Sequence, residues 1–177
     1  ATLARQYDAT TTSAGSTLSS FDALQGGETL TMTGSGTAAS KNVANGIAMA
    51  SNGTLALANG TGAASNYSLN STVINISQTS VDLSGSKTYD GNTTISNSSV
   101  NVASGLIGSE TLSLTGVVNA NNANVGSYSA SGGTLNMGST TIALANGANG
   151  GLAANYAIND GNFTIIQRVV GVSGTRL

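Results

Sequence analysis

One pattern occurs twice in the sequence, as Gly26-Gly27-Glu28-Thr29-Leu30-Thr31-Met32-Thr33-Gly34 and as Gly108-Ser109-Glu110-Thr111-Leu112-Ser113-Leu114-Thr115-Gly116. In both copies, residues that carry a hydroxyl group alternate with Leu or Met between flanking glycines. A period of two places the Leu and Met side chains on one face of a β-strand and the hydroxyls on the other. The pattern therefore predicts a half-buried strand that is bounded by turns.

The repetition extends to both sides of this strand. Tyr7-Asp8 returns as Tyr89-Asp90, 82 positions later, and Asn66-Tyr67 returns as Asn155-Tyr156, 89 positions later. The separation grows along the chain, so the second copy carries short insertions, which fall in loops rich in Gly, Asn and Ser. Near the end, Val170 matches Val81. We therefore expect one repeat at residues 1–79, a second at 80–168, and the start of a third at 169–177.

The remaining patterns also predict strands. Alternating apolar residues at 74–76 and 163–165 indicate a closing strand in each repeat, and the pairs Asn45-Gly46, Asn52-Gly53 and Gly132-Gly133 are suited to tight hairpins. No segment has the pattern of a capped helix. We expect an all-β chain of two tandem small antiparallel β-domains, arranged end to end because their junctions are short. An immunoglobulin-like sandwich is favoured, and a β-grasp-like sheet is the alternative, because strand order cannot be read from the sequence.

Composition excludes several classes of function. Charged residues make up 7% of the chain, the net charge is −2, and the sequence contains no His, Cys, Pro or Trp. Nucleic-acid binding requires clustered Lys and Arg, and insertion into a membrane requires about 20 consecutive apolar residues. Without His or Cys, the sequence offers no activated nucleophile with its base. We expect no enzymatic activity, no nucleic-acid partner and no membrane insertion.

The segment at 84–94, Ser-Gly-Ser-Lys-Thr-Tyr-Asp-Gly-Asn-Thr-Thr, resembles the signature of the YDG repeat. Asn124-Val125-Gly126 and Ala154-Asn155-Tyr156 follow in the order of that family. The first copy has Ala9 where Gly91 stands in the second, and because Ala is strained at positive φ, we expect that turn to differ. YDG repeats occur in large bacterial exoproteins similar to filamentous hemagglutinin. The resemblance thus implies two-partner secretion, an extracellular or bacterial cell-surface location, and a role in cell adhesion or biofilm, with no catalytic residues.

The residues that recur at equivalent positions are the candidate sites, and we assign them a structural role in the repeat motif: Tyr7, Asp8, Tyr89, Asp90, Gly91, Glu28, Glu110, Asn66, Tyr67, Asn155 and Tyr156. A calcium site built from the recurring carboxylates is the alternative to Asx-turns and hairpin ends; no other cofactor is expected. For the tyrosines, carbohydrate stacking is the alternative to core filling. The recurring cations Arg5, Lys87 and Arg176 either pair with a carboxylate or are solvated on an edge strand.

Asn-x-Ser/Thr sequons form a second class of candidate, for glycosylation. Chance supplies many of them in a chain so rich in Asn, Ser and Thr. The eight positions are Asn52, Asn59, Asn66, Asn70, Asn75, Asn92, Asn97 and Asn162.

Three functions fit these observations. The first is a stalk or spacer segment of a large surface adhesin, whose partners are the neighbouring repeats of the same chain. The second is a module that binds a host or matrix glycan through loop Asn and Tyr residues. The third is a self-associating subunit, in which like chains assemble into a fibre or matrix.

Overall fold

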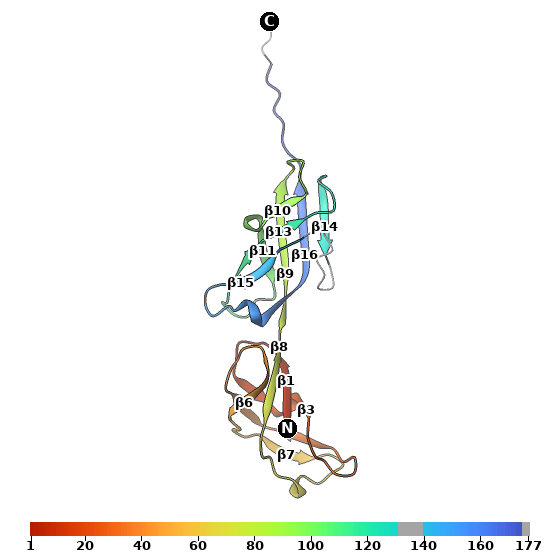
Figure 1. Cartoon of the computed structure of the whole chain (residues 1–177), viewed down its shortest axis with the longest axis vertical. Coiled ribbons are helices and arrows are strands. Elements are labelled where there is room, and N and C mark those ends of the chain that lie inside the picture. The colour runs from red at the N-terminus through yellow and green to blue at the C-terminus, as the bar shows by residue number, and fades with distance from the viewer. Residues whose placement is uncertain (131–139, 175–177) are drawn as a thin grey trace. The chain divides into compact units, whose positions relative to one another are not determined.

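The computed structural model describes residues 1–130 and 140–174, and it is nearly all β, with 49% of residues in strands and 7% in helices. Within these residues the helical segments are 3-10 turns of three residues each. The chain divides into two compact units, Ala1–Thr79 and Ser80–Leu177, called unit 1 and unit 2 below. Figure 1 shows the strands of each unit. The expected all-β class is confirmed, while the Gly132-Gly133 hairpin lies outside the described residues.

Unit 1 is built from one six-stranded sheet, in the order β2-β5-β6-β8-β1-β3, and a two-stranded sheet of β4 and β7. The two 3-10 turns of the unit are η1 (Gly15–Thr17) and η2 (Ala64–Asn66). Its strands are β1 (Thr2–Gln6), β2 (Thr12–Ala14), β3 (Leu18–Ser20), β4 (Leu30–Thr33), β5 (Ser35–Ala38), β6 (Ala44–Ser51), β7 (Ala56–Asn59) and β8 (Val73–Ser77).

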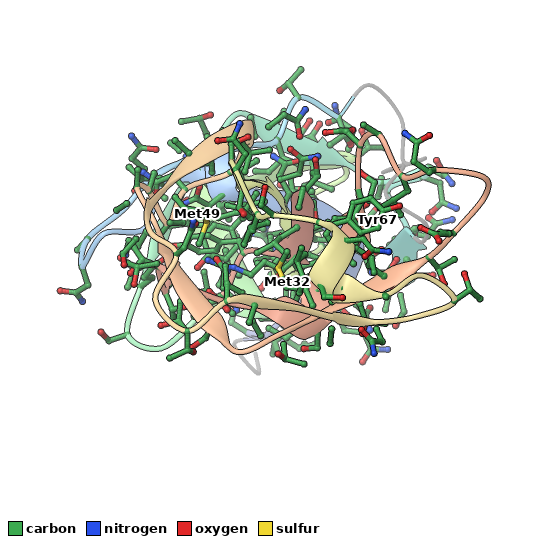
Figure 2. All side chains as sticks on the ribbon, turned by 90° about the horizontal axis from the view of Figure 1, so that it is seen from below. Met32, Met49 and Tyr67 are labelled. Carbon is green, nitrogen blue, oxygen red and sulfur yellow. The ribbon has the colours of Figure 1, made fainter. Side chains whose placement is uncertain are left out.

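The strand predicted from the repeated pattern is β4. Leu30 and Met32 are 6% and 5% exposed, whereas Thr31 and Thr33 face solvent. Figure 2 labels Met32 among the side chains of this unit. The alternation expected from the period of two is therefore confirmed.

One strand pair contradicts the expectation of purely antiparallel domains. Strands β1 and β8 pair in parallel, with Leu3 opposite Ile74 and Arg5 opposite Ile76. Parallel neighbours require a long crossover connection, and here the rest of the unit provides it, because β1 is its first strand and β8 its last. A parallel pair also departs from the immunoglobulin-like sandwich, whose two sheets are antiparallel.

Unit 2 has a four-stranded sheet in the order β11-β9-β16-β14, and the two-stranded sheets β10-β13 and β12-β15. Its 3-10 turns are η3 (Asn97–Ser99) and η4 (Ala153–Asn155). Its strands are β9 (Thr79–Thr88), β10 (Thr94–Ser96), β11 (Val100–Ser104), β12 (Leu112–Thr115), β13 (Val117–Asn119), β14 (Gly126–Ala130), β15 (Ala143–Asn146) and β16 (Tyr156–Ile166).

The sheets of unit 2 share one core. Strands of the four-stranded sheet contribute Leu83, Val100 and Phe163, and the β10-β13 pair contributes Ile95 and Val118. These side chains form a single buried cluster. A small all-β unit gains stability when its sheets bury their apolar faces against one another, and this cluster is where unit 2 does so.

Both units keep the turn that follows the Tyr-Asp motif. Ala9 has φ of 62° and Gly91 has φ of 81°. The expectation that the first turn differs because of Ala9 is wrong: the surrounding hydrogen bonds hold Ala9 in the left-handed region, where an L-residue is strained by about 1–2 kcal/mol.

We expect Ala9→Gly to stabilise unit 1 by about 0.5–1 kcal/mol, because relief of the left-handed strain exceeds the added freedom of the unfolded chain. The reverse change, Gly91→Ala, should cost unit 2 about the same. It introduces no clash, since no atom lies within 4 Å of a Cβ built at Gly91. Urea unfolding of both variants provides the measurement. Opposite signs at the two positions are required, and two destabilised variants would contradict the strain argument.

Candidate functional site

The cation before the Tyr-Asp motif of unit 2 is enclosed by acceptors. Lys87 Nζ donates to Asp90 Oδ1 at 2.6 Å, to the Asn92 carbonyl at 2.6 Å and to the Thr94 carbonyl at 2.9 Å. The backbone N–H of Asn92 donates to the same Asp90 oxygen at 2.9 Å, which makes an Asx-turn. Lys87 thus pins the loop at Asp90 to the end of β9.

Unit 1 repeats this arrangement with Arg in place of Lys. Arg5 pairs with Asp8 and donates to the Thr10 carbonyl at 2.6 Å. The backbone N–H and the hydroxyl of Thr10 both donate to Asp8 Oδ1 at 2.9 Å.

The Arg5 and Lys87 side chains are 9% and 10% exposed, whereas those of their Asp partners are 49% and 46% exposed. Of the two alternatives for Arg5 and Lys87, the structure shows pairing with a carboxylate, and not a solvated edge-strand cation, because Asp8 or Asp90 and backbone carbonyls replace water around them. Arg176 lies outside the described residues.

These contacts affect both aspartates. The hydrogen bond from Lys87, followed by that from the Asn92 amide, lowers the pKa of Asp90 below 3.8. Partial burial acts to raise the pKa of Asp8, but hydrogen bonds from Thr10 and the charge of Arg5 outweigh it and lower that pKa below 3.8. A carboxylate with a depressed folded-state pKa stabilises the fold above its unfolded pKa, and this stabilisation is lost as pH falls through the folded value.

We expect the free energy of unfolding to fall as pH drops below about 4, since the unfolded chain then takes up protons that the folded Asp8 and Asp90 resist. The variant carrying both Asp8→Asn and Asp90→Asn should show a smaller loss between pH 5 and pH 2.5, at a lower stability near neutrality. Urea midpoints measured across this range supply the comparison. An unchanged pH slope in the double variant would show that the turns do not contribute.

A second repeated contact joins a Tyr to a Glu. In unit 2, the Tyr156 hydroxyl donates to Glu110 Oε2 at 2.7 Å and accepts from the Ile107 amide at 3.2 Å. In unit 1, the Tyr67 hydroxyl donates to Glu28 and accepts from the Gln25 amide at 3.2 Å. Tyr67 therefore connects the turn before β4 to the segment that leads into β8, and Tyr156 connects the turn before β12 to the first residue of β16.

Burial distinguishes the two copies of this contact. Tyr156 and Glu110 are 2% and 6% exposed, whereas Tyr67, labelled in Figure 2, and Glu28 are half-buried. Burial, and then the bond to Glu110, raises the pKa of Tyr156. The bond to Glu28 is the main cause that raises the pKa of Tyr67. Both phenols therefore stay protonated above their usual range and remain donors.

Tyrosines at equivalent positions of the two repeats differ in how much of their side chain is exposed. Tyr7 is 2% exposed, while its counterpart Tyr89 is 39% exposed. Tyr89 lines an open pocket of about 640 Å³ in unit 2, together with Asn124, Val125, Gln167, Arg168 and Val170. Among the four tyrosines of the repeat motif, Tyr89 therefore presents the most surface to a ligand. The sequence patterns did not single out the other lining residues, although Asn124 and Val125 lie in the segment 124–126, which follows the order of the YDG repeat.

The two Asn residues of the Asn-Tyr motif also differ. Asn155 is 1% exposed, whereas Asn66 faces solvent. Of the eight sequon positions, Asn75 is half-buried and the others are exposed. Asn97 Nδ2 donates to the Leu114 carbonyl at 2.8 Å, so a glycan there would displace this bond. Glycosylation at these positions stays a prediction.

Neither a metal-binding cluster of side chains nor a membrane-spanning helix occurs in the part of the chain that the structure describes. Across residues 1–130 and 140–174, no group of three or more His, Cys, Asp or Glu side chains lies close enough to hold a metal ion. Calcium binding by fewer carboxylates and backbone oxygens stays a prediction. In the same residues, none of the helices has the length and apolar character needed to cross a membrane.

Comparison with known protein families gives a match to part of this chain. A YDG domain is found at residues 1–75, which is nearly all of unit 1. The matched copy reads Tyr7-Asp8-Ala9, and its turn has the backbone conformation of the Gly91 turn in unit 2. No curated protein and no solved structure matches the chain.

Proposed function

We propose that this chain is a stalk or spacer segment of a large secreted bacterial surface adhesin, with a role in cell adhesion or biofilm. One observation carries the proposal: the recurring polar side chains of both units make hydrogen bonds within their own unit. Arg5 and Lys87 hold turns, and Tyr67 and Tyr156 tie down Glu28 and Glu110. Residues that recur to maintain a fold suit a segment whose task is to extend a chain. The YDG domain at 1–75 supports the family context of this proposal.

The spacer role is tested by glycan and matrix-protein arrays probed with the two-unit chain. A spacer produces no reproducible specific signal, and a specific hit that survives competition overturns the assignment. Surface location needs a separate test on cells of the source organism, in which an antibody against this segment labels intact cells. Labelling that appears only after lysis contradicts the proposed location.

A glycan-binding module is the second candidate, and the pocket at Tyr89 is the observation that favours it. An exposed aromatic ring beside the amides of Asn124 and Gln167 combines a stacking surface with hydrogen-bonding groups. If an array gives a hit, Tyr89→Ala should abolish it, and Tyr67→Phe, which alters a tyrosine of unit 1, should leave it unchanged. Loss of binding in both variants would point to a different surface.

A further inference from the structure

The chain contains five Asn-Gly dipeptides, and all of them lie in the part that the structure describes. They stand at 45–46, 52–53, 59–60, 146–147 and 149–150, and each of the five Asn residues is exposed. Asn is a thermally labile residue, above all before Gly, because a residue without a side chain leaves its backbone nitrogen accessible and mobile. Exposure does not distinguish the five positions, so their hydrogen bonds must decide which of them react.

The reaction at such a dipeptide is deamidation. The backbone nitrogen of Gly loses its proton and attacks the side-chain carbonyl carbon of Asn. A new C–N bond forms, the bond to the side-chain amide nitrogen breaks, and ammonia leaves, so that a cyclic succinimide remains. Water then opens the ring to give Asp or isoaspartate. Hydrogen bonds that hold either the Gly amide or the Asn side chain therefore slow the reaction.

The Asn59-Gly60 dipeptide of unit 1 is held by two hydrogen bonds. Asn59 Oδ1 accepts from the amide of Ala64, the first residue of η2, at 2.8 Å, and the Gly60 N–H donates to the Gly62 carbonyl at 3.2 Å. Gly60 is also enclosed, since a Cβ built on it would lie 2.4 Å from the Thr29 carbonyl oxygen. Attack on Asn59 therefore requires that both bonds break and that Gly60 moves away from Thr29.

The equivalent Asn146-Gly147 dipeptide of unit 2 is held in the same way. Asn146 Oδ1 accepts from the amide of Ala153, the first residue of η4, at 2.9 Å, and the Gly147 N–H donates to the Gly151 carbonyl at 3.0 Å. A Cβ built on Gly147 would lie 2.1 Å from the Thr111 carbonyl oxygen. The repeat thus keeps this Asn-Gly pair in an unreactive arrangement in both units.

In the first two dipeptides of the chain, a side chain holds the Gly amide. The Gly46 N–H donates to Asn75 Oδ1 at 2.8 Å, and the Gly53 N–H donates to Ser51 Oγ at 3.1 Å. One bond must therefore open before the nitrogen of either Gly can attack.

The Asn149-Gly150 dipeptide differs from the other four in its Gly amide. The Gly150 N–H makes no hydrogen bond with any residue among those that the structure describes. The pair lies in the loop between β15 and η4, and Asn149 Nδ2 makes an exposed hydrogen bond of 3.0 Å to the Ser109 carbonyl. We propose that Asn149 deamidates spontaneously in the folded chain, whereas the recurring Asn59 and Asn146 stay intact.

Deamidation removes the bond that Asn149 makes. A carboxylate has no hydrogen to donate, and it repels the Ser109 carbonyl oxygen that the amide contacts. It also adds one negative charge to a chain whose net charge is −2, and the isoaspartate form lengthens the backbone by a methylene group. The loop between β15 and η4 is therefore released from the turn before β12 as the chain ages.

The test is incubation of the full chain at mildly alkaline pH and physiological temperature, followed over time by peptide mapping and fragmentation in a mass spectrometer. Conversion of an amide to a carboxyl group raises the mass of the fragment that contains it. We expect Asn149 to deamidate at least about tenfold faster than Asn59 and Asn146, because two hydrogen bonds must open at each of those positions. The rates at Asn45 and Asn52 should fall between these limits.

The same chain in urea is the control. Unfolding opens every hydrogen bond, so the five positions should react at similar rates, since Gly follows each Asn. Equal rates at Asn149 and Asn146 in the folded chain overturn the inference, and so does faster conversion at Asn45 or Asn52. A preference for Asn149 that persists in urea also overturns it, because the selectivity would then come from the local sequence.

Ala153→Pro is a matched variant for the protection of Asn146. It removes the N–H that donates to Asn146 Oδ1, and the backbone suits Pro there, because Ala153 begins η4 and Leu152 is extended, with φ of −104° and ψ of 123°. Deamidation of Asn146 should accelerate about fivefold, while Asn149 and Asn59 keep their rates. An unchanged rate at Asn146 would contradict protection by this bond. The spacer role does not depend on the result, because a chain that binds no glycan can still deamidate.

Discussion

Replacing Phe163 by Ala is expected to lower the free energy of unfolding of unit 2 by about 3–5 kcal/mol. Phe163 is fully buried and packs in the cluster with Leu83, Ile95 and Val118. Its ring lies against Gly85, where an added Cβ would be 3.2 Å from a ring atom. Truncation leaves a cavity between sheets that are joined by few other large side chains, because the chain has only seven Phe and Tyr residues and no Trp. We therefore expect the largest loss of stability at this position.

Hydrogen exchange read separately for each unit, combined with urea unfolding, measures this effect. Protection of β9 and β16 amides should fall strongly. Val172→Ala, at a side chain that is 99% exposed, serves as the control and should change stability by no more than about 0.5 kcal/mol. A loss below about 1 kcal/mol for Phe163→Ala would contradict the assignment of one shared core to unit 2.

Glu110→Ala should destabilise unit 2 by about 2–3 kcal/mol, because it removes the charged acceptor of the buried Tyr156 hydroxyl. The bond is 2.7 Å long and both side chains are almost fully buried. The matched change Glu28→Ala should cost unit 1 no more than about 1 kcal/mol, since water can solvate the half-buried Tyr67 hydroxyl after the acceptor is lost.

Tyr156→Phe and the double variant complete a cycle for this contact. We expect a coupling energy between Tyr156 and Glu110 of about 1–2 kcal/mol, which is the part that belongs to the pair itself. Thermal or urea unfolding at pH 7 is sufficient for the measurement. Equal costs for Glu110→Ala and Glu28→Ala would show that burial does not set the strength of the bond.

Local patterns predicted much of this fold because strand periodicity depends on neighbouring residues alone. The alternation at residues 29–33 located β4 and identified which of its side chains are buried. The absence of helical periodicity also agreed with the 3-10 turns of three residues that the described chain contains. For the candidate site, the recurrence of Tyr-Asp drew attention to Asp8 and Asp90, which accept the hydrogen bonds of a turn. Such a turn is closed by residues only two to seven positions apart, as in Lys87, Asp90, Asn92 and Thr94.

Longer-range features escaped the same reasoning. The sequence left open whether Arg5 and Lys87 pair with a carboxylate or are solvated on an edge strand, and it could not show that carbonyls from the following loop surround them. It treated Tyr7 and Tyr89 as equivalents, although one is buried and the other is exposed. Burial of a side chain depends on segments far away in the chain, so two copies of one motif acquire different environments without any change in the motif.

The sequence by itself determined the β class, the repeat and the identity of the turn residues. Each of these follows from local periodicity and from residues of limited backbone freedom. Only the tertiary structure decided that β1 and β8 pair in parallel, that Glu110 is buried while Glu28 is half-buried, and that Tyr7 is buried while Tyr89 is exposed. Each of these depends on which distant strands become neighbours. Backbone hydrogen bonds between strands form with almost any side chains, so the sequence alone does not specify that pairing.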